Sequence, residues 1–152
     1  MPPRPVVRVA TVDDLDLLIR LRRTWTEETG THEDPSFPAR FRSWFDQESA
    51  RRTFWLVSLD DEPVGTGNLL EFERMPRPAQ PAGRWGYLGN LFVLAEIRNR
   101  GLGSALLAAI LRHADDHHYE RVVLHPTVAS RPLYARHGFG AADQLLLRPR
   151  PG

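Results

Sequence analysis

Between residues 98 and 103 the sequence reads Arg98-Asn99-Arg100-Gly101-Leu102-Gly103. This stretch lies between a strand-like apolar run, 87–93, and a helix-like run that begins near Gly103. Its glycines have no Cβ atom, so the backbone can turn tightly and approach a bulky anion. The helix that follows presents unpaired N–H groups and the positive end of its dipole. The sequence therefore predicts a phosphate-binding turn, to which Arg98 and Arg100 add positive charge.

Two well-known nucleotide-binding motifs do not fit this turn. A Walker loop needs Lys followed by Ser or Thr after its last glycine, and here Ser104 and Ala105 follow Gly103. The dinucleotide fingerprint needs Gly or Ala three residues after its second glycine, and Leu106 occupies that position. Taken alone, the hexapeptide leaves open an ordinary strand-to-helix turn in which the glycines serve backbone geometry only.

A second motif lies downstream, where residues 133–139 read Leu-Tyr-Ala-Arg-His-Gly-Phe. The Arg-x-x-Gly-x-Gly turn and this Leu-Tyr-x-x-x-Gly-Phe segment together resemble the signature motifs of the GNAT superfamily of acyl-CoA-dependent N-acetyltransferases. Their order, and the helix and strand between them, also match that family. The resemblance is specific from about Tyr87 to Phe139, and the earlier part of the chain agrees in pattern rather than in motif.

The composition indicates one domain that spans residues 1–152. Hydrophobic residues make up 41% and charged residues 26%, as in an ordinary globular protein. The net charge of +1 gives no electrostatic argument for a nucleic-acid or membrane partner. The chain has no cysteine, which excludes disulfides, a thiolate nucleophile and thiolate metal sites. No apolar run approaches the ~20 residues that cross a bilayer, so we expect a cytoplasmic protein.

Hydrophobic periodicity predicts an α/β (α+β) chain. Strands are expected at 6–10, 54–59, 64–72, 84–93, 122–124 and 145–147, and helices at 11–28, 38–49, from 103 onward and at 130–137. This order resembles the GNAT topology, which implies a mixed, mostly antiparallel central sheet, flanked by helices, with a V-shaped parting between two parallel strands. The family usually has two strands after the Gly-Phe pair, and the chain is too short for both. An exposed edge near 145–147 would then be covered in a homodimer.

The resemblance implies that acetyl-CoA binds as a cosubstrate, and no metal site is expected. Backbone groups of Leu91, Phe92 and Val93 would bind the pantetheine and the acetyl oxygen where the parallel strands part; the same residues can equally be plain core. Thr127 stands where many relatives have an Asn that contacts the pantetheine arm. The pyrophosphate would lie on the glycine turn, whose expected binding residues are Arg98, Asn99, Arg100, Gly101, Leu102, Gly103 and Ser104.

Tyr134 is the expected general acid, because a phenol keeps its proton at neutral pH and can give it to a departing thiolate. The alternative is that its ring only anchors the short helix. Glu71 and Glu73 are the candidate general bases, since they share one face at the end of a strand; each alone can also be a solvated carboxylate. His125 and Asn90 are further polar neighbours of the expected acetyl site.

The sequence thus predicts an enzyme that moves an acetyl group from acetyl-CoA to a primary amine. Direct attack in a ternary complex is favoured, because no nucleophile with an activating base is evident. The acceptor would be a small-molecule or peptide amine, framed by the loops 29–38 and 75–83 by analogy with relatives. Acidic residues at 27–34 favour a cationic acceptor. The alternative is a non-catalytic acyl-CoA-binding sensor or regulatory module, which would need no proton donor.

Overall fold

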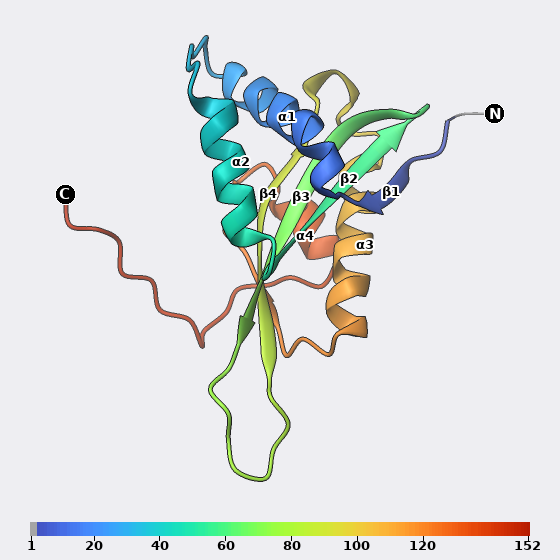
Figure 1. The fold of residues 1–152 in the computed structure, drawn as a ribbon. Coiled ribbons are helices and arrows are strands. Elements are labelled where there is room, and N and C mark those ends of the chain that lie inside the picture. The colour runs from blue at the N-terminus through green and yellow to red at the C-terminus, as the bar shows by residue number, and fades with distance from the viewer. Residues whose placement is uncertain (1–2) are drawn as a thin grey trace.

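The computed structural model describes residues 3–152, which form a five-stranded sheet with helices on both faces (Figure 1). The strands lie side by side in chain order, and all neighbours are antiparallel except the last pair, which is parallel. Their bounds are Val6–Val9 (β1), Arg52–Leu59 (β2), Glu62–Glu73 (β3), Arg84–Val93 (β4) and Val122–Val123 (β5). The predicted mixed, mostly antiparallel sheet is confirmed.

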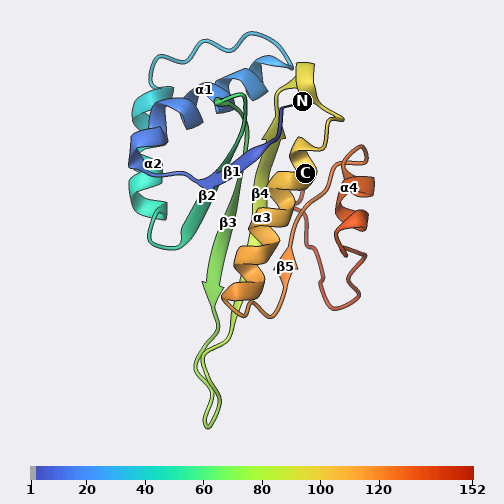
Figure 2. The same ribbon diagram turned by 90° about the vertical axis from the view of Figure 1, so that its right-hand side faces the viewer.

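Helices α1 and α2 cover one face of the sheet, and α3 and α4 lie on the other side (Figure 2). Two short 3-10 helices, η1 and η2, precede α1 and the glycine turn. Within residues 3–152, no helix combines the length and the apolar character that a membrane crossing requires. The bounds are Val12–Asp14 (η1), Leu15–Glu27 (α1), Phe37–Glu48 (α2), Ala95–Ile97 (η2), Leu102–Asp116 (α3) and Arg131–Arg136 (α4).

Each face of the sheet has its own hydrophobic core. In β2, Phe54 and Leu56 pack with residues of α1 and α2, whereas Trp55 and Val57 pack with residues of α3. Successive strand residues point to opposite faces, so a strand that is apolar throughout can fill both cores. The central strands are thereby packed against helices on both faces, which fixes the positions of their ends.

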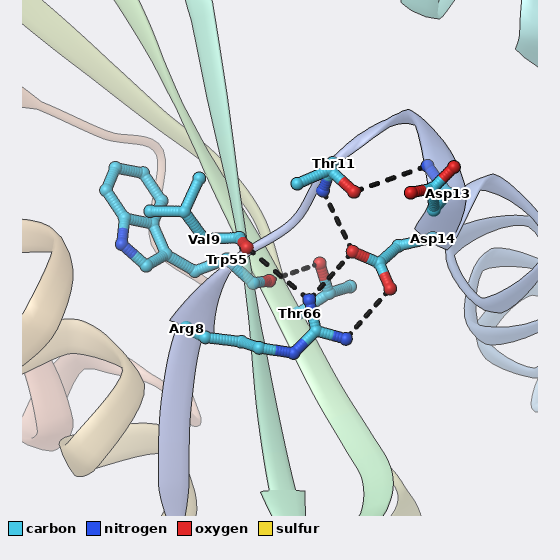
Figure 3. Close-up of polar contacts among 7 residues, drawn as sticks. All are labelled: Arg8, Val9, Thr11, Asp13, Asp14, Trp55 and Thr66. Carbon is cyan, nitrogen blue, oxygen red and sulfur yellow. Dashed lines mark hydrogen bonds and ion pairs between the residues drawn. The ribbon is translucent and has the colours of Figure 1, made fainter.

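An ion pair fixes the entry from β1 into α1 (Figure 3). The Nη1 and Nη2 atoms of Arg8 donate to the two carboxylate oxygens of Asp14, both at 2.8 Å. The backbone N–H of Thr11 also donates to Asp14, while the Thr11 hydroxyl accepts from the N–H of Asp13. The hydrogen bonds from Arg8 and Thr11 lower the pKa of the buried Asp14 carboxyl to about 2. Thr11 therefore caps η1, which leads directly into α1.

The two parallel strands separate soon after they meet. β4 pairs with β5 only through Gly86 with Val122 and Tyr87 with Val123. β4 then continues along β3 to Val93, whereas β5 has already ended. The rest of β4 therefore has no strand on that side among residues 3–152, which is the predicted parting.

The expected last strand at 145–147 is wrong, because residues 137–152 contain no strand and leave the sheet as irregular chain (Figure 1). Leu146 is 98% exposed and Leu147 is 74% exposed. Three consecutive leucines lack the alternation of a half-buried strand, and the two-residue β5 offers little edge for backbone pairing. An apolar run alone was therefore insufficient evidence for a strand.

Candidate functional site

The glycine turn leads from η2 into α3 beside the open end of β4. Gly101 has φ of 81°, in the left-handed region that favours glycine, so the turn itself requires this residue. Gly103 lies within α3, and a Cβ there would meet only Leu133, at an ordinary 3.5 Å. Neither backbone conformation nor packing requires glycine at 103. Its missing side chain leaves open space at the helix N-terminus, as the close approach of a phosphate group would need.

The two arginines of the turn have different surroundings. The Nε atom of Arg98 donates to the carbonyl of Val93 at 2.8 Å, and its guanidinium pairs with Glu28 just after α1. Arg100 is exposed and forms no ion pair with any residue of 3–152. Arg98 therefore ties the turn to β4 and α1, and Arg100 is the arginine available to an anion.

A hydrogen bond joins the two sequence motifs. The Ser104 Oγ in the first turn of α3 lies 2.7 Å from the Nε2 of His137, at the end of α4. His137 was not among the predicted site residues, because it occupies one of the unspecified positions of the Leu-Tyr-x-x-x-Gly-Phe motif. The contact fixes α4, and with it Tyr134, relative to the glycine turn.

β4 has a bulge near the point where β5 leaves it. Two residues, Asn90 and Leu91, lie opposite the single residue Gly67 of β3. Asn90 has φ of 57°, which is unusual for a residue with a side chain. A bulge leaves the backbone of one residue unpaired and redirects the neighbouring side chains. Backbone groups of β4 are therefore available at the parting, where the sequence predicted that the thioester binds.

The other two predicted strand residues lie next to the bulge. Phe92 is 4% exposed, and its ring stacks on Trp25 of α1 with the centroids 5.3 Å apart. The carbonyl of Val93 already accepts the hydrogen bond from Arg98. Phe92 thus packs in the core, and Val93 holds the glycine turn. Of the three strand residues predicted to bind the thioester, only Leu91 lies in the bulge.

An aromatic cavity of about 330 Å³ lies between α1, α2 and the sheet, on the face opposite α3. The bulge forms part of its wall, so a molecule in the cavity reaches β4 from the opposite side to α3. Sequence reasoning missed this cavity because its aromatic side chains have the spacing of an ordinary core. The lining residues are Leu18, Leu21, Arg22, Trp25, Phe37, Arg40, Phe41, Trp44, Phe54, Thr66, Asn68, Asn90 and Phe92.

Tyr134 lies on the other side of the sheet, in the core with α3. It is 8% exposed, and its ring packs edge-on against Phe139 with the centroids 5.6 Å apart. Its hydroxyl makes no hydrogen bond with residues 3–152, and it lies at the wall of a second cavity of about 580 Å³ beside β5. Burial raises the pKa of Tyr134, so the phenol stays protonated at neutral pH.

The predicted carboxylates lie far along β3 from the bulge. Glu71 is opposite Gly86, which places it roughly 13 Å from Asn90 at ~3.3 Å per strand residue. Its Oε1 accepts a hydrogen bond from the Tyr119 hydroxyl at 2.8 Å. Glu73 is exposed at the end of the strand. The structure brings neither carboxylate to the bulge or into the lining of the aromatic cavity.

A hydrogen-bonded pair spans the beginning of the parting. The Tyr87 hydroxyl lies 2.9 Å from the Nδ1 of His125. The Tyr87 ring lies 3.6 Å from the position that a Cβ of Gly89 would take, and the Asn68 side chain lies 3.9 Å from the same point. The Tyr87 ring is therefore next to the cavity wall, and Tyr87 is nearer along β4 to the bulge than Gly86, which lies opposite Glu71. Sequence reasoning considered His125 alone and missed Tyr87, because a tyrosine within a strand has the pattern of core.

Thr127 is engaged in a local turn before α4. Its hydroxyl donates to the Ser130 Oγ at 2.9 Å, and its backbone N–H donates to the same oxygen at 2.9 Å. These bonds position the start of α4. A contact between Thr127 and a pantetheine arm stays a prediction.

Solved structures of known proteins share this fold. Solved structures of similar fold include a predicted acetyltransferase from Clostridium acetobutylicum with acetyl-CoA, at 19% identity and a TM-score of 0.76, covering 96% of both chains. They also include a GCN5-related N-acetyltransferase from Ralstonia eutropha, at 28% identity and a TM-score of 0.73, covering 98% of this chain and 100% of that one. Glucosamine-6-phosphate N-acetyltransferase from Arabidopsis thaliana has 14% identity and a TM-score of 0.73, with 96% and 98% covered.

No curated protein sequence matches significantly. The family model for the acetyltransferase (GNAT) family matches residues 18–139, which include both motifs, the parting and the bulge. The chain therefore belongs to the GNAT family of acetyltransferases.

Proposed function

We propose that this protein transfers an acetyl group from acetyl-CoA to a primary amine by direct attack in a ternary complex. Acetyl-CoA is the acetyl donor, as the acetyltransferase family implies. The observation that carries the proposal is the arrangement around β4. The open helix N-terminus at Gly103 and the strand bulge would bind acetyl-CoA. The aromatic cavity, which would hold the amine, reaches the same bulge from the opposite face of the sheet.

The chemistry needs few groups. The amine nitrogen attacks the thioester carbon, so a C–N bond forms and the C–S bond breaks. The amine loses a proton to a base, and the CoA thiolate gains one from an acid. Negative charge develops on the thioester oxygen, where an unpaired backbone N–H at the bulge would stabilise it.

Tyr134 is the proposed acid, supported by its protonated phenol and by a hydroxyl that is free of partners among residues 3–152. Glu71 and Glu73 remain the bases that the sequence predicts. Their distance from the bulge argues against direct proton transfer from the amine to either carboxylate. His125, held by Tyr87 beside the cavity, is the nearer titratable group, and we propose it as a second candidate base.

A single domain over residues 1–152 and a homodimer also remain proposals. Support for the homodimer no longer comes from an edge strand. It comes from the apolar surface at Leu145, Leu146 and Leu147, which are 43%, 98% and 74% exposed.

An acceptor screen tests the proposed function. Purified protein is incubated with acetyl-CoA and polyamines, amino acids, aminoglycosides or peptide N-termini, and free CoA thiol is measured together with the mass of the acceptor. We expect one amine class to gain an acetyl group with equal release of CoA. Tight acetyl-CoA binding without acetylation of any amine would instead support the alternative, a non-catalytic acyl-CoA-binding sensor.

A further inference from the structure

The aromatic cavity has ionisable groups of one sign only. Its lining includes Arg22 and Arg40, and no aspartate or glutamate. Arg40 is largely exposed and pairs with Asp34, so its charge is compensated. Arg22 forms no ion pair with residues 3–152, and its guanidinium carbon lies 4.4 Å from the ring centroid of Trp25. An uncompensated positive charge therefore lies at the cavity wall.

The Asn68 amide presents a hydrogen-bond donor on the sheet side of the cavity. Asn68 is 2% exposed, and its Oδ1 accepts a hydrogen bond from the Nη1 of Arg52 at 2.7 Å. Its Nδ2 then remains a donor, and no residue of 3–152 accepts from it. Because Asn68 lines the cavity and its Nδ2 has no acceptor among residues 3–152, a ligand in the cavity can supply one.

The acidic residues that favoured a cationic acceptor do not contribute negative charge to this cavity. Glu28 pairs with Arg98, and Asp34 bonds Ser36 as well as Arg40. Glu27 and Glu33 are exposed and do not line the cavity. A cation would thus meet guanidinium groups and aromatic rings, whereas an anion would meet a guanidinium and an open amide donor.

On this basis, and resting on the proposed acetyl transfer, we infer that the acceptor is a small amine with a carboxylate and a flat apolar body, as in an aromatic amino acid acetylated on its α-amino group. Arg22 and Asn68 would bind the carboxylate. The rings of α1 and α2 would enclose the body, and the amine would lie toward Asn90 at the bulge. A volume of about 330 Å³ is near the lower end of small-molecule sites, which suits a ligand of this size.

Matched acceptors test this inference. Phenylalanine, its amide and phenethylamine share the ring and the amine but differ in the carboxylate, and spermidine represents the cationic class. We expect kcat/KM for phenylalanine to exceed that for phenethylamine at least about tenfold. Arg22→Gln should remove this advantage through KM, with a much larger loss for phenylalanine than for phenethylamine. Arg20→Gln, an equal charge change on the exposed face of the same helix, should retain it.

The outcomes separate this inference from the proposed function. Preference for spermidine, or equal turnover of phenylalanine and phenethylamine, overturns the inference while acetyl transfer stands. If no amine is acetylated, equilibrium binding still tests whether the cavity selects a carboxylate. Trp25 and Trp44 line the cavity, so their fluorescence should change when a ligand binds. Carboxylate-dependent binding that Arg22→Gln abolishes would support the inference in that case. Binding that is indifferent to the carboxylate would contradict it.

Discussion

Gly101 and Gly103 are alike in the sequence but have different physical roles in the structure. Gly101 satisfies the left-handed backbone of the turn, with φ of 81°. Gly103 has ordinary helical surroundings in which a Cβ would contact only Leu133, so its missing side chain matters only if another molecule comes close. Periodicity and motif order were enough to predict the turn. They could not separate these roles, because φ values and free space are properties of the folded chain.

At Tyr134, the change to Phe tests the general acid. Tyr134→Phe should lower kcat at least about tenfold, because the proposed general acid acts only as the thiolate leaves. Affinity for acetyl-CoA and the melting temperature should change little, since the ring stays and the hydroxyl has no partner among residues 3–152. Single-turnover rates are the measurement, so that slow product release cannot mask the effect. Wild-type rates in the variant would mean that Tyr134 is structural.

At the scale of elements, the helices and the first five strands lie close to where the sequence predicted them. The prediction failed at 145–147, because strand formation depends on a neighbour and not on apolar residues alone. The aromatic cavity was also missed. Its walls come from α1, α2, β2, β3 and β4, and Trp25, Phe41 and Trp44 have the helical spacing of core residues. Which aromatic side chains surround empty space is decided by how the elements pack.

The junction between β1 and α1 predicts a pH-dependent stability. The folded-state pKa of Asp14 is about 2, below the ordinary value of 3.8, so its contribution is complete above about pH 4 and is lost as the pH falls toward 2. Asp14→Asn should lower the free energy of unfolding by about 1–3 kcal/mol at neutral pH and reduce its slope between about pH 4 and 2. Denaturant unfolding at several pH values measures both quantities.

Asp13 provides the matched control for this junction. It is exposed in the same 3-10 turn, and its side chain forms no ion pair with residues 3–152. Asp13→Asn should leave the unfolding free energy within about 0.5 kcal/mol of wild type. An identical pH dependence in wild type and Asp14→Asn would contradict the role of the Arg8–Asp14 pair.

At the scale of the whole molecule, the segment 145–147 predicts association. Leu146 is almost fully exposed and Leu147 is about three-quarters exposed, and the second cavity lies next to this segment. We expect wild-type protein to sediment as a dimer, and Leu146→Asp with Leu147→Asp to sediment as a monomer with an unchanged melting temperature, because these side chains bury little within one chain. A wild-type monomer at high concentration would rule the dimer out.

The proposed function requires that acetyl-CoA reaches the parting with its pyrophosphate on the N-terminus of α3. Calorimetric titration of acetyl-CoA into wild type, Gly103→Ala and Gly103→Val tests this most directly. The Cβ of either side chain would make an ordinary contact of 3.5 Å with Leu133, and the melting temperature of each variant checks that it folds. We predict that Gly103→Val weakens binding at least about tenfold, with Gly103→Ala between it and wild type, because each added carbon occupies space that the phosphate needs. Wild-type affinity in Gly103→Val would contradict the account.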